Sequence, residues 1–162
     1  MSRSKTFVGI VVLLAFFAIG LSAQTKKNHP KGKYDAKLAE KLGADQYGMK
    51  SYVMIVLKTG PNDSKITDKA QRGDLFKGHF ANMTRLAKEG KLVFAGPFID
   101  GRPKRGLWIL AVETVAEAEK LIKTDPTVSA GVFVYEMTKL YGSAALMQVG
   151  EIHERIQKTS VN

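Results

Sequence analysis

Apolar segments of two different periods alternate along residues 50–143, and their order limits the fold more than any other feature of the chain. Four segments are short and rich in β-branched or aromatic residues, which is typical of strands: 51–61, 91–99, 105–113 and 130–141. Two others repeat apolar residues at helical spacing and open with a capping residue, Asp68 or Thr114: 68–89 and 114–124. The expected order of elements is therefore β-α-β-β-α-β.

This order predicts the α+β class, with a ferredoxin-like antiparallel sheet that carries both helices on one face. The first strand is nonetheless apolar on both faces, because two sets of apolar residues alternate along it: Tyr52, Met54 and Val56 with Val53, Ile55 and Leu57. The face without helices needs a cover, and a second copy of the sheet is the simplest one. We therefore expect a homodimer.

The composition limits the kinds of site that the chain is able to form. The 162 residues are 44% hydrophobic and 25% charged, a balance typical of one globular domain, and the lack of Cys excludes disulfides and a thiol nucleophile. His29, His79 and His153 are too far apart to form a metal-binding spacing, and no phosphate-binding glycine loop is present. The sequence thus predicts no metal and no cofactor.

The N-terminus has the parts of a secretory signal peptide over residues 1–23. Arg3 and Lys5 precede the uncharged segment 7–21, and small residues end at Ala23. An uncleaved membrane anchor is the alternative, but the apolar run is short for a bilayer span. We expect export to the periplasm or the medium, with no membrane attachment after cleavage.

Residues 24–49 are predicted to form a Lys-rich linker followed by a short helix. The formal charge of +10 is partly due to this linker, which has four lysines and no acid over residues 24–34. Because no basic face with stacking aromatics follows, we expect no nucleic-acid partner. Residues 50–143 form the predicted domain, and 144–162 form a tail with a short helix.

His79 and Asp125 are the strongest candidates for chemistry. His79 projects from the apolar face of the helix over 68–89, where Phe76, Phe80, Met83, Leu86 and Ala87 also lie. It is either a general base tuned by burial and a carboxylate or an inert core histidine. Asp125 precedes Pro126, so it is either a site residue or the N-cap of a turn over 126–130.

Weaker candidates surround this pair. Asp100 lies in the turn DGRPK, and Arg85 and Tyr141 are further polar residues of the same domain. Basic residues near the turn are able to steer an anion toward a neighbouring pocket, although they equally suit a solvated loop: Arg102, Lys104 and Arg105.

Several spaced motifs over residues 50–143 resemble the YCII-related domain family. They are a helical histidine, a Gly-Pro closing the second strand, and an Asp-Pro followed by an Ala-Gly before the last strand: His79, Gly96-Pro97, Asp125-Pro126 and Ala130-Gly131. The chain departs from the family's pattern at the end of the last strand, where Lys139-Leu140 precedes Tyr141 in place of a Pro-Trp step.

The resemblance implies a subunit that dimerises as an α+β barrel, with a pocket between sheet and helices. It implies that His79 and Asp125 form an active-site pair. Four further residues are then candidates for ligand binding: Gly96, Pro97, Asp100 and Tyr141.

Two functions remain open. The first is a domain that binds a small anionic or aromatic molecule without catalysis, which the lack of a second polar cluster favours. The second is a cofactor-free enzyme of lyase, isomerase or hydrolase type, in which Asp125 orients His79 for acid–base chemistry on a small acid or phenolic compound. A His79–Asp125 distance within hydrogen-bond reach, with access to solvent, is the observation that favours the enzyme.

Overall fold

The computed structural model describes residues 32–159. The predicted signal peptide over 1–23 and the first part of the linker lie outside the described residues. Within residues 32–159, no helix is long and apolar enough to cross a membrane.

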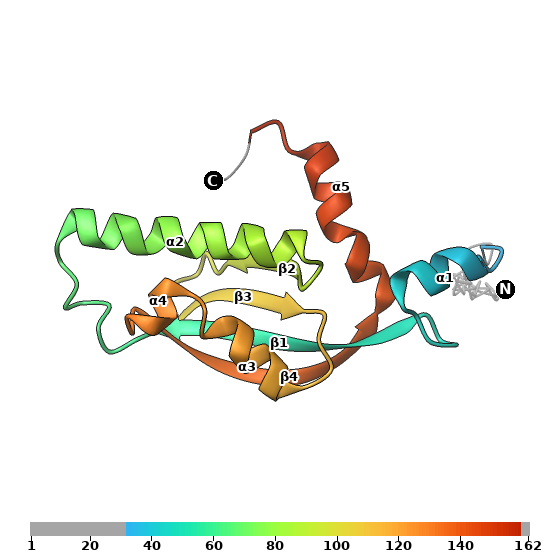
Figure 1. Cartoon of the computed structure of the whole chain (residues 1–162), viewed down its shortest axis with the longest axis horizontal. Helices are drawn as coiled ribbons and strands as arrows, with labels where there is room; N and C mark the ends of the chain where they lie inside the picture. Colours follow the sequence, from blue (N-terminus) through green and yellow to red (C-terminus); the bar gives the residue numbers. More distant parts are fainter. Residues whose placement is uncertain (1–31, 160–162) are drawn as a thin grey trace, which may run out of the picture. The chain divides into compact units, whose positions relative to one another are not determined.

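Four strands form one antiparallel sheet in the order β2-β3-β1-β4. Their bounds are Met49–Thr59 (β1), Leu92–Pro97 (β2), Lys104–Leu110 (β3) and Phe133–Ser143 (β4). The long helix α2 connects β1 to β2, and shorter helices connect β3 to β4 (Figure 1). The predicted ferredoxin-like α+β order is confirmed.

The helices begin at the residues that the sequence suggests. Asp68 caps α2 (Lys69–Lys88) and Thr114 caps α3 (Val115–Ile122), each by accepting a hydrogen bond from a backbone N–H of the first turn. The remaining helices are short: α1 (Ala36–Leu42), α4 (Pro126–Ser129), a 3-10 helix (Ala144–Gln148) and α5 (Val149–Ile156).

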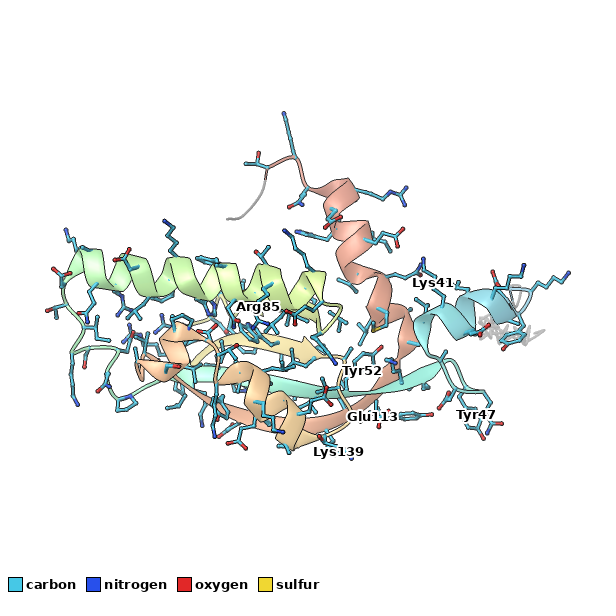
Figure 2. The ribbon with its side chains drawn as sticks, viewed as in Figure 1. Lys41, Tyr47, Tyr52, Arg85, Glu113 and Lys139 are labelled. Carbon is cyan, nitrogen blue, oxygen red and sulfur yellow. The ribbon has the colours of Figure 1, made fainter. Side chains whose placement is uncertain are left out.

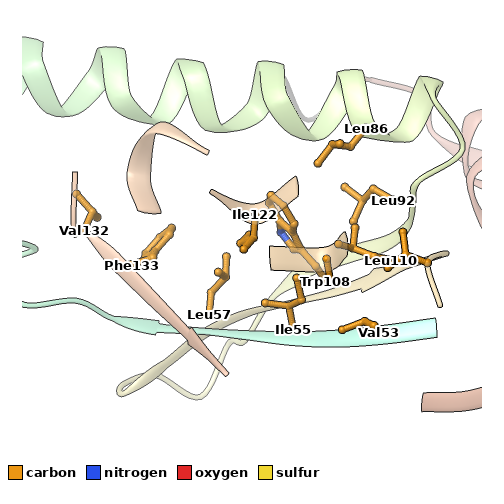
Figure 3. Packing of buried hydrophobic residues seen from close by; sticks show 12 residues of the cluster. Val53, Ile55, Leu57, Leu86, Leu92, Trp108, Leu110, Ile122, Val132 and Phe133 are labelled. Carbon is orange, nitrogen blue, oxygen red and sulfur yellow. The ribbon is translucent and has the colours of Figure 1, made fainter. Parts of the chain in front are cut away.

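The hydrophobic core lies between the helices and one face of the sheet. Figure 3 shows Leu86 of α2 pointing toward Trp108 and Leu110 of β3, and Ile122 of α3 belongs to the same buried cluster. Alternate residues of β1 supply the floor of the core: Val53, Ile55 and Leu57.

The opposite face of the sheet is apolar, and apart from the fully buried Tyr52 its residues on β1 are only partly buried. Met54 pairs with Ile109 and Val56 with Leu107 across β1 and β3, which places these four side chains on the face away from the core. Phe94, the partner of Ile109 on β2, is exposed. The prediction of two apolar faces on the first strand is therefore confirmed for the subunit.

The buried face of α2 agrees only in part with the predicted one. His79, Asn82 and Leu86 are its buried residues, whereas Phe80 and Ala87 are exposed. The predicted face is confirmed at His79 and Leu86, and Phe76 and Met83 pack against the core, but Asn82 was not predicted to be buried. The His79 and Asn82 side chains are buried with hydrogen-bond partners that lie 42 or more residues further along the chain.

Candidate functional site

His79 and Asp125 meet where α2 crosses the N-terminus of α4. The imidazole Nδ1 lies 2.7 Å from Oδ2 of the carboxylate, and Asp125 has no exposed surface. Asp125 is held there by the backbone, since Pro126 starts α4 and Asp125 is its N-cap. The His–Asp pairing that the resemblance implies is thus present as a direct contact.

Hydrogen-bond donors surround the Asp125 carboxylate on both oxygens. The N–H and the hydroxyl of Thr127 donate to Oδ1 at 2.9 and 2.5 Å, and the Asn82 amide donates to Oδ2 at 3.4 Å. Burial by itself raises the pKa of the Asp125 carboxyl. The hydrogen bonds from His79 and Thr127 outweigh it, so the pKa lies below its usual value and the group is ionised at neutral pH.

An ionised carboxylate only accepts hydrogen bonds, and this fixes the imidazole. Nδ1 of His79 must donate to Asp125, so the neutral ring carries its proton on Nδ1 and leaves the Nε2 lone pair free. The His79 side chain retains 9% of its surface. The only buried side-chain N or O atom without a partner in residues 32–159 is the Thr59 hydroxyl, so Nε2 is in reach of solvent.

Aromatic rings enclose the imidazole. Trp108 of β3 stacks on it with centroids 5.6 Å apart, and three phenylalanines contact it by their edges: Phe76, Phe80 and Phe133. An apolar wall of this kind excludes water from a reacting group and strengthens the electrostatic contact with Asp125. Because Phe80 is exposed, this ring lies at the solvent side of the pair.

A glycine permits α2 and α4 to approach each other. A Cβ atom on Gly78 would lie 2.8 Å from Cγ of Pro126, closer than real Cβ contacts allow. Gly78 precedes His79 and Pro126 follows Asp125, so this approach is what brings the pair together. The helical glycine thus has a packing role in addition to its cost in helix propensity.

A second layer of polar contacts supports Asn82. Its side-chain oxygen accepts hydrogen bonds from Arg85 at 2.8 Å and from the Thr124 hydroxyl at 3.0 Å, which turns its amide nitrogen toward Asp125. Arg85 extends from the C-terminal half of α2 (Figure 2). Arg85 therefore supports the pair indirectly and does not contact it.

Asn82 and Thr127 belong to the site but were not predicted from the sequence. Asn82 is one helical turn after His79 on the same face, and Thr127 is the second residue after an Asp that precedes proline, a position from which a hydroxyl bonds the capping carboxylate. Both signals are local: one is a polar residue on the same helix face as His79, and the other is a hydroxyl in a turn that an Asp caps.

The other predicted site residues do not contact this pair. Gly96 faces Phe94, on the uncovered side of the sheet, while Pro97 and Asp100 are exposed at and beyond the end of β2.

Tyr141 lies at the other end of the sheet. Its hydroxyl donates to Asp45 in a groove that Glu113 and Lys91 also line, and Figure 2 shows Glu113 toward the end of the sheet opposite α4. The bond to the Asp45 carboxylate, together with partial desolvation, raises the pKa of the Tyr141 hydroxyl. Tyr141 therefore does not contribute to the surroundings of His79.

A basic cluster lies next to the aromatic wall. The buried Asp63 carboxylate contacts three guanidinium groups, those of Arg72 at 2.6 Å and of Arg102 and Arg105 at 3.3 Å. The hydrogen bond from Arg72 is the main reason that the pKa of the Asp63 carboxyl lies below its usual value. Of these residues, Arg102 and Arg105 were named from the sequence as able to steer an anion or as part of a solvated loop, and Arg72 and Asp63 were not named.

Together, the four-stranded antiparallel sheet, the helices on one face and the buried His–Asp pair define an α+β domain of the ferredoxin-like type. The chain belongs to the YCII-related domain family, whose pattern matches residues 51–140, more than half of its length. The family resemblance seen in the sequence motifs is thereby confirmed.

One solved structure to which the chain is similar is 5-chloro-2-hydroxyhydroquinone dehydrochlorinase (TftG) from Burkholderia phenoliruptrix AC1100, in complex with 2,5-dihydroxybenzoquinone. It is 20% identical, with a TM-score of 0.42, and the match covers 54% of this chain and 90% of that chain. No curated protein matches the chain.

Proposed function

We propose that the protein is an enzyme that transfers a proton on a small organic molecule, with His79 as the base and Asp125 as its positioning residue. One observation carries this proposal: Nδ1 of His79 is 2.7 Å from an ionised, fully buried carboxylate, while Nε2 has no partner among residues 32–159. In a core histidine with a purely structural role, each buried ring nitrogen usually has a hydrogen-bond partner. Here one nitrogen is fixed and the other is left free.

In this proposal Nε2 removes a proton from a carbon or oxygen of the substrate. The bond to the substrate hydrogen breaks and its electron pair stays on the substrate, which either eliminates a leaving group or is reprotonated elsewhere by the imidazolium. The Asp125 carboxylate stabilises the positive ring that forms between the two steps. General acid–base assistance of this kind contributes about 10²–10⁴-fold to a rate.

Binding without catalysis is the second candidate, and the burial of His79 favours it. Only 9% of the side chain is exposed, and Trp108 covers one face of the ring. A ligand that binds at the solvent side of the aromatic rings around His79 would contact Phe80 and would transfer no proton to the imidazole.

A screen for proton exchange separates the two candidates. Small carboxylic acids and phenolic compounds are incubated with the protein in D₂O, and deuterium incorporation or turnover is followed by proton NMR. The proposal expects at least one compound to react with wild type and not with the His79→Gln variant. If compounds bind, as judged by Trp108 fluorescence, and none exchanges or reacts, the protein is a binding domain.

We also propose that the subunit forms a homodimer through the uncovered face of its sheet. The apolar residues Met54, Val56, Leu107 and Ile109 remain partly exposed on this face, and Phe94 is exposed beside them. A second sheet laid on this face would bury an apolar surface without a change of fold.

We also propose that the protein is exported. It is supported by the charged start, the apolar segment and the small residues over 1–23. The mass of the protein recovered from a periplasmic extract or from the culture medium tests it, since cleavage after Ala23 gives a defined N-terminus at Gln24.

A further inference from the structure

The guanidinium groups around Asp63 carry more positive charge than its single carboxylate neutralises. One carboxylate meets three guanidinium groups, those of Arg72, Arg102 and Arg105. Asp63 is only 6% exposed, and the loop that holds it is fixed to the segment after α4 through a hydrogen bond from the Asn62 N–H to the Gly131 carbonyl. Arg72 and Arg105 are thus held in place, and the three arginines retain N–H donors that Asp63 does not use.

A bulge in β3 turns Arg105 toward the core side of the sheet. Leu57 of β1 pairs with Gly106 and Lys58 pairs with Lys104, so Arg105 is the additional residue on its strand. An extra residue of this kind re-aims a side chain. The Arg105 guanidinium lies 5.2 Å from the ring centre of Phe133, the same ring that contacts His79.

Arg72, on helix α2, also lies over a phenyl ring. Its guanidinium lies 5.4 Å from the centre of Phe76, and Phe76 contacts both His79 and Phe133 by ring edges. Each of these two arginines is therefore separated from the imidazole by one phenyl ring.

An unpartnered hydroxyl adjoins the cluster. Thr59 is the cross-strand partner of Phe133, and its Oγ1 is the only buried side-chain N or O atom in the described chain that has no hydrogen-bond partner. A buried polar atom without a partner is costly unless something binds it. Thr59 is therefore next to the residue whose ring contacts Arg105.

We propose that Arg72, Arg102 and Arg105 form a subsite for the carboxylate of a small aromatic acid whose ring lies along Phe76 and Phe133 toward His79. The inference rests on the proposed function for its reacting end and on separate residues for its anionic end. Guanidinium groups bind carboxylates by paired, charge-assisted hydrogen bonds, and the phenyl rings supply a planar apolar surface.

Benzoate is the probe that tests this subsite, and Trp108, the only Trp of the chain, is the reporter. Because Trp108 stacks on His79, a ring that enters the site changes its fluorescence. Titrations with benzoate, with phenol, with acetate and with inorganic phosphate separate the roles of ring and charge. We expect saturable binding of benzoate and affinities lower by about tenfold or more for the other three.

Variants then assign the anionic end. Arg105→Gln is expected to weaken benzoate binding about tenfold or more, since a charge-assisted hydrogen bond is lost. Arg102 is largely exposed, so Arg102→Gln lowers affinity without a risk to folding. Arg155→Gln on the exposed helix α5 removes a guanidinium outside the cluster and is expected to leave the affinity unchanged. Circular dichroism checks that each variant is folded.

The His79→Gln variant separates failure of this inference from failure of the proposed function. If the variant still binds benzoate and wild type never exchanges a proton, the subsite stands and the enzyme does not. If proton exchange depends on His79 while Arg102→Gln and Arg105→Gln bind benzoate like wild type, the subsite is wrong. Equal binding of benzoate and phosphate, or no saturable binding, also overturns the inference.

Discussion

His79 and Thr127 bind opposite oxygens of the Asp125 carboxylate, His79 at Oδ2 and Thr127 at Oδ1. The bond to Thr127 caps α4 and fixes the plane of the carboxylate, and the fixed carboxylate in turn orients the imidazole. One side chain therefore has a structural contact and a site contact at the same time. The orientation of His79 follows from how a four-residue helix begins.

Replacing Asp125 by Asn should separate these two contacts. The Asn oxygen is still able to accept from the Thr127 N–H, so the cap is retained. The other atom becomes an NH₂ group that no longer accepts the proton of His79 Nδ1. We expect kcat for any substrate found to fall about 10²–10⁴-fold with little change in KM.

Steady-state kinetics of wild type and Asp125→Asn, together with their unfolding in urea, check this. Asn82→Ala serves as the companion variant, because it removes a 3.4 Å contact to the same oxygen and leaves the imidazole bond. A variant Asp125→Asn with unchanged kcat would show that the carboxylate has no part in the reaction.

Gly78→Ala should destabilise the protein. The new methyl group would lie 2.8 Å from the Pro126 ring and force α2 and α4 apart. Overpacking of this kind costs about 1–3 kcal/mol. Gly73→Ala is the matched control in the same helix, since no atom lies within 4 Å of its Cβ position, and it should gain up to about 1 kcal/mol in helix propensity.

Thermal unfolding and urea denaturation of the two variants measure these free energies. Two glycines of one helix are thus expected to respond with opposite signs. A Gly78→Ala variant as stable as Gly73→Ala would mean that the two helices do not approach as closely as described.

Stability should fall in acid. The pKa values of the Asp63 and Asp125 carboxyls are lower in the folded protein than in the unfolded chain, where they are about 3.9. The folded state therefore binds fewer protons in this range. Its stabilisation is complete above the unfolded pKa and is lost as the pH falls through the lowered folded values.

Urea denaturation between pH 7 and pH 2 measures this loss. The Asp63→Asn variant lacks one of the two groups, and its free energy of unfolding should change less below about pH 4 than that of wild type. Parallel curves for the two proteins would mean that Asp63 does not contribute to the acid sensitivity.

Phe94→Lys should break the proposed homodimer. Phe94 is 38% exposed on the uncovered face, so a lysine there keeps its charge in water in the single subunit but meets an apolar partner in the dimer. Light scattering coupled to size exclusion should give twice the subunit mass for wild type and the subunit mass for the variant. Lys139→Glu, an exposed change on β4, is the control for an altered charge. A wild-type protein that elutes as a single subunit would contradict the dimer.

The sequence predicts the fold well because the elements are marked locally. Asp68 and Thr114 are helix caps, and the alternation along residues 52–57 places a strand with two apolar faces. These signals need no knowledge of distant contacts. Boundaries differ by a few residues, as at β4, which begins at Phe133.

The site is predicted less completely, because its contacts join distant parts of the chain. Nothing local indicates that Arg72 on α2 and Arg105 in a strand bulge share Asp63, since a bulge depends on the register of the paired strand. Tyr141 is misleading in the opposite sense. It lies on the same strand as Phe133, but β4 is long enough to place it at the far end of the sheet.

The protonation of the His79 ring is the most direct test of the central claim, that Asp125 fixes Nδ1 as the donor and leaves Nε2 as a base. Nitrogen-15 NMR of protein labelled at histidine measures it, and the His79→Gln variant assigns the signal among the three histidines of the chain. We expect the neutral ring to carry its proton on Nδ1 in wild type and to lose this preference in Asp125→Asn. A neutral ring protonated on Nε2 in wild type would contradict the account.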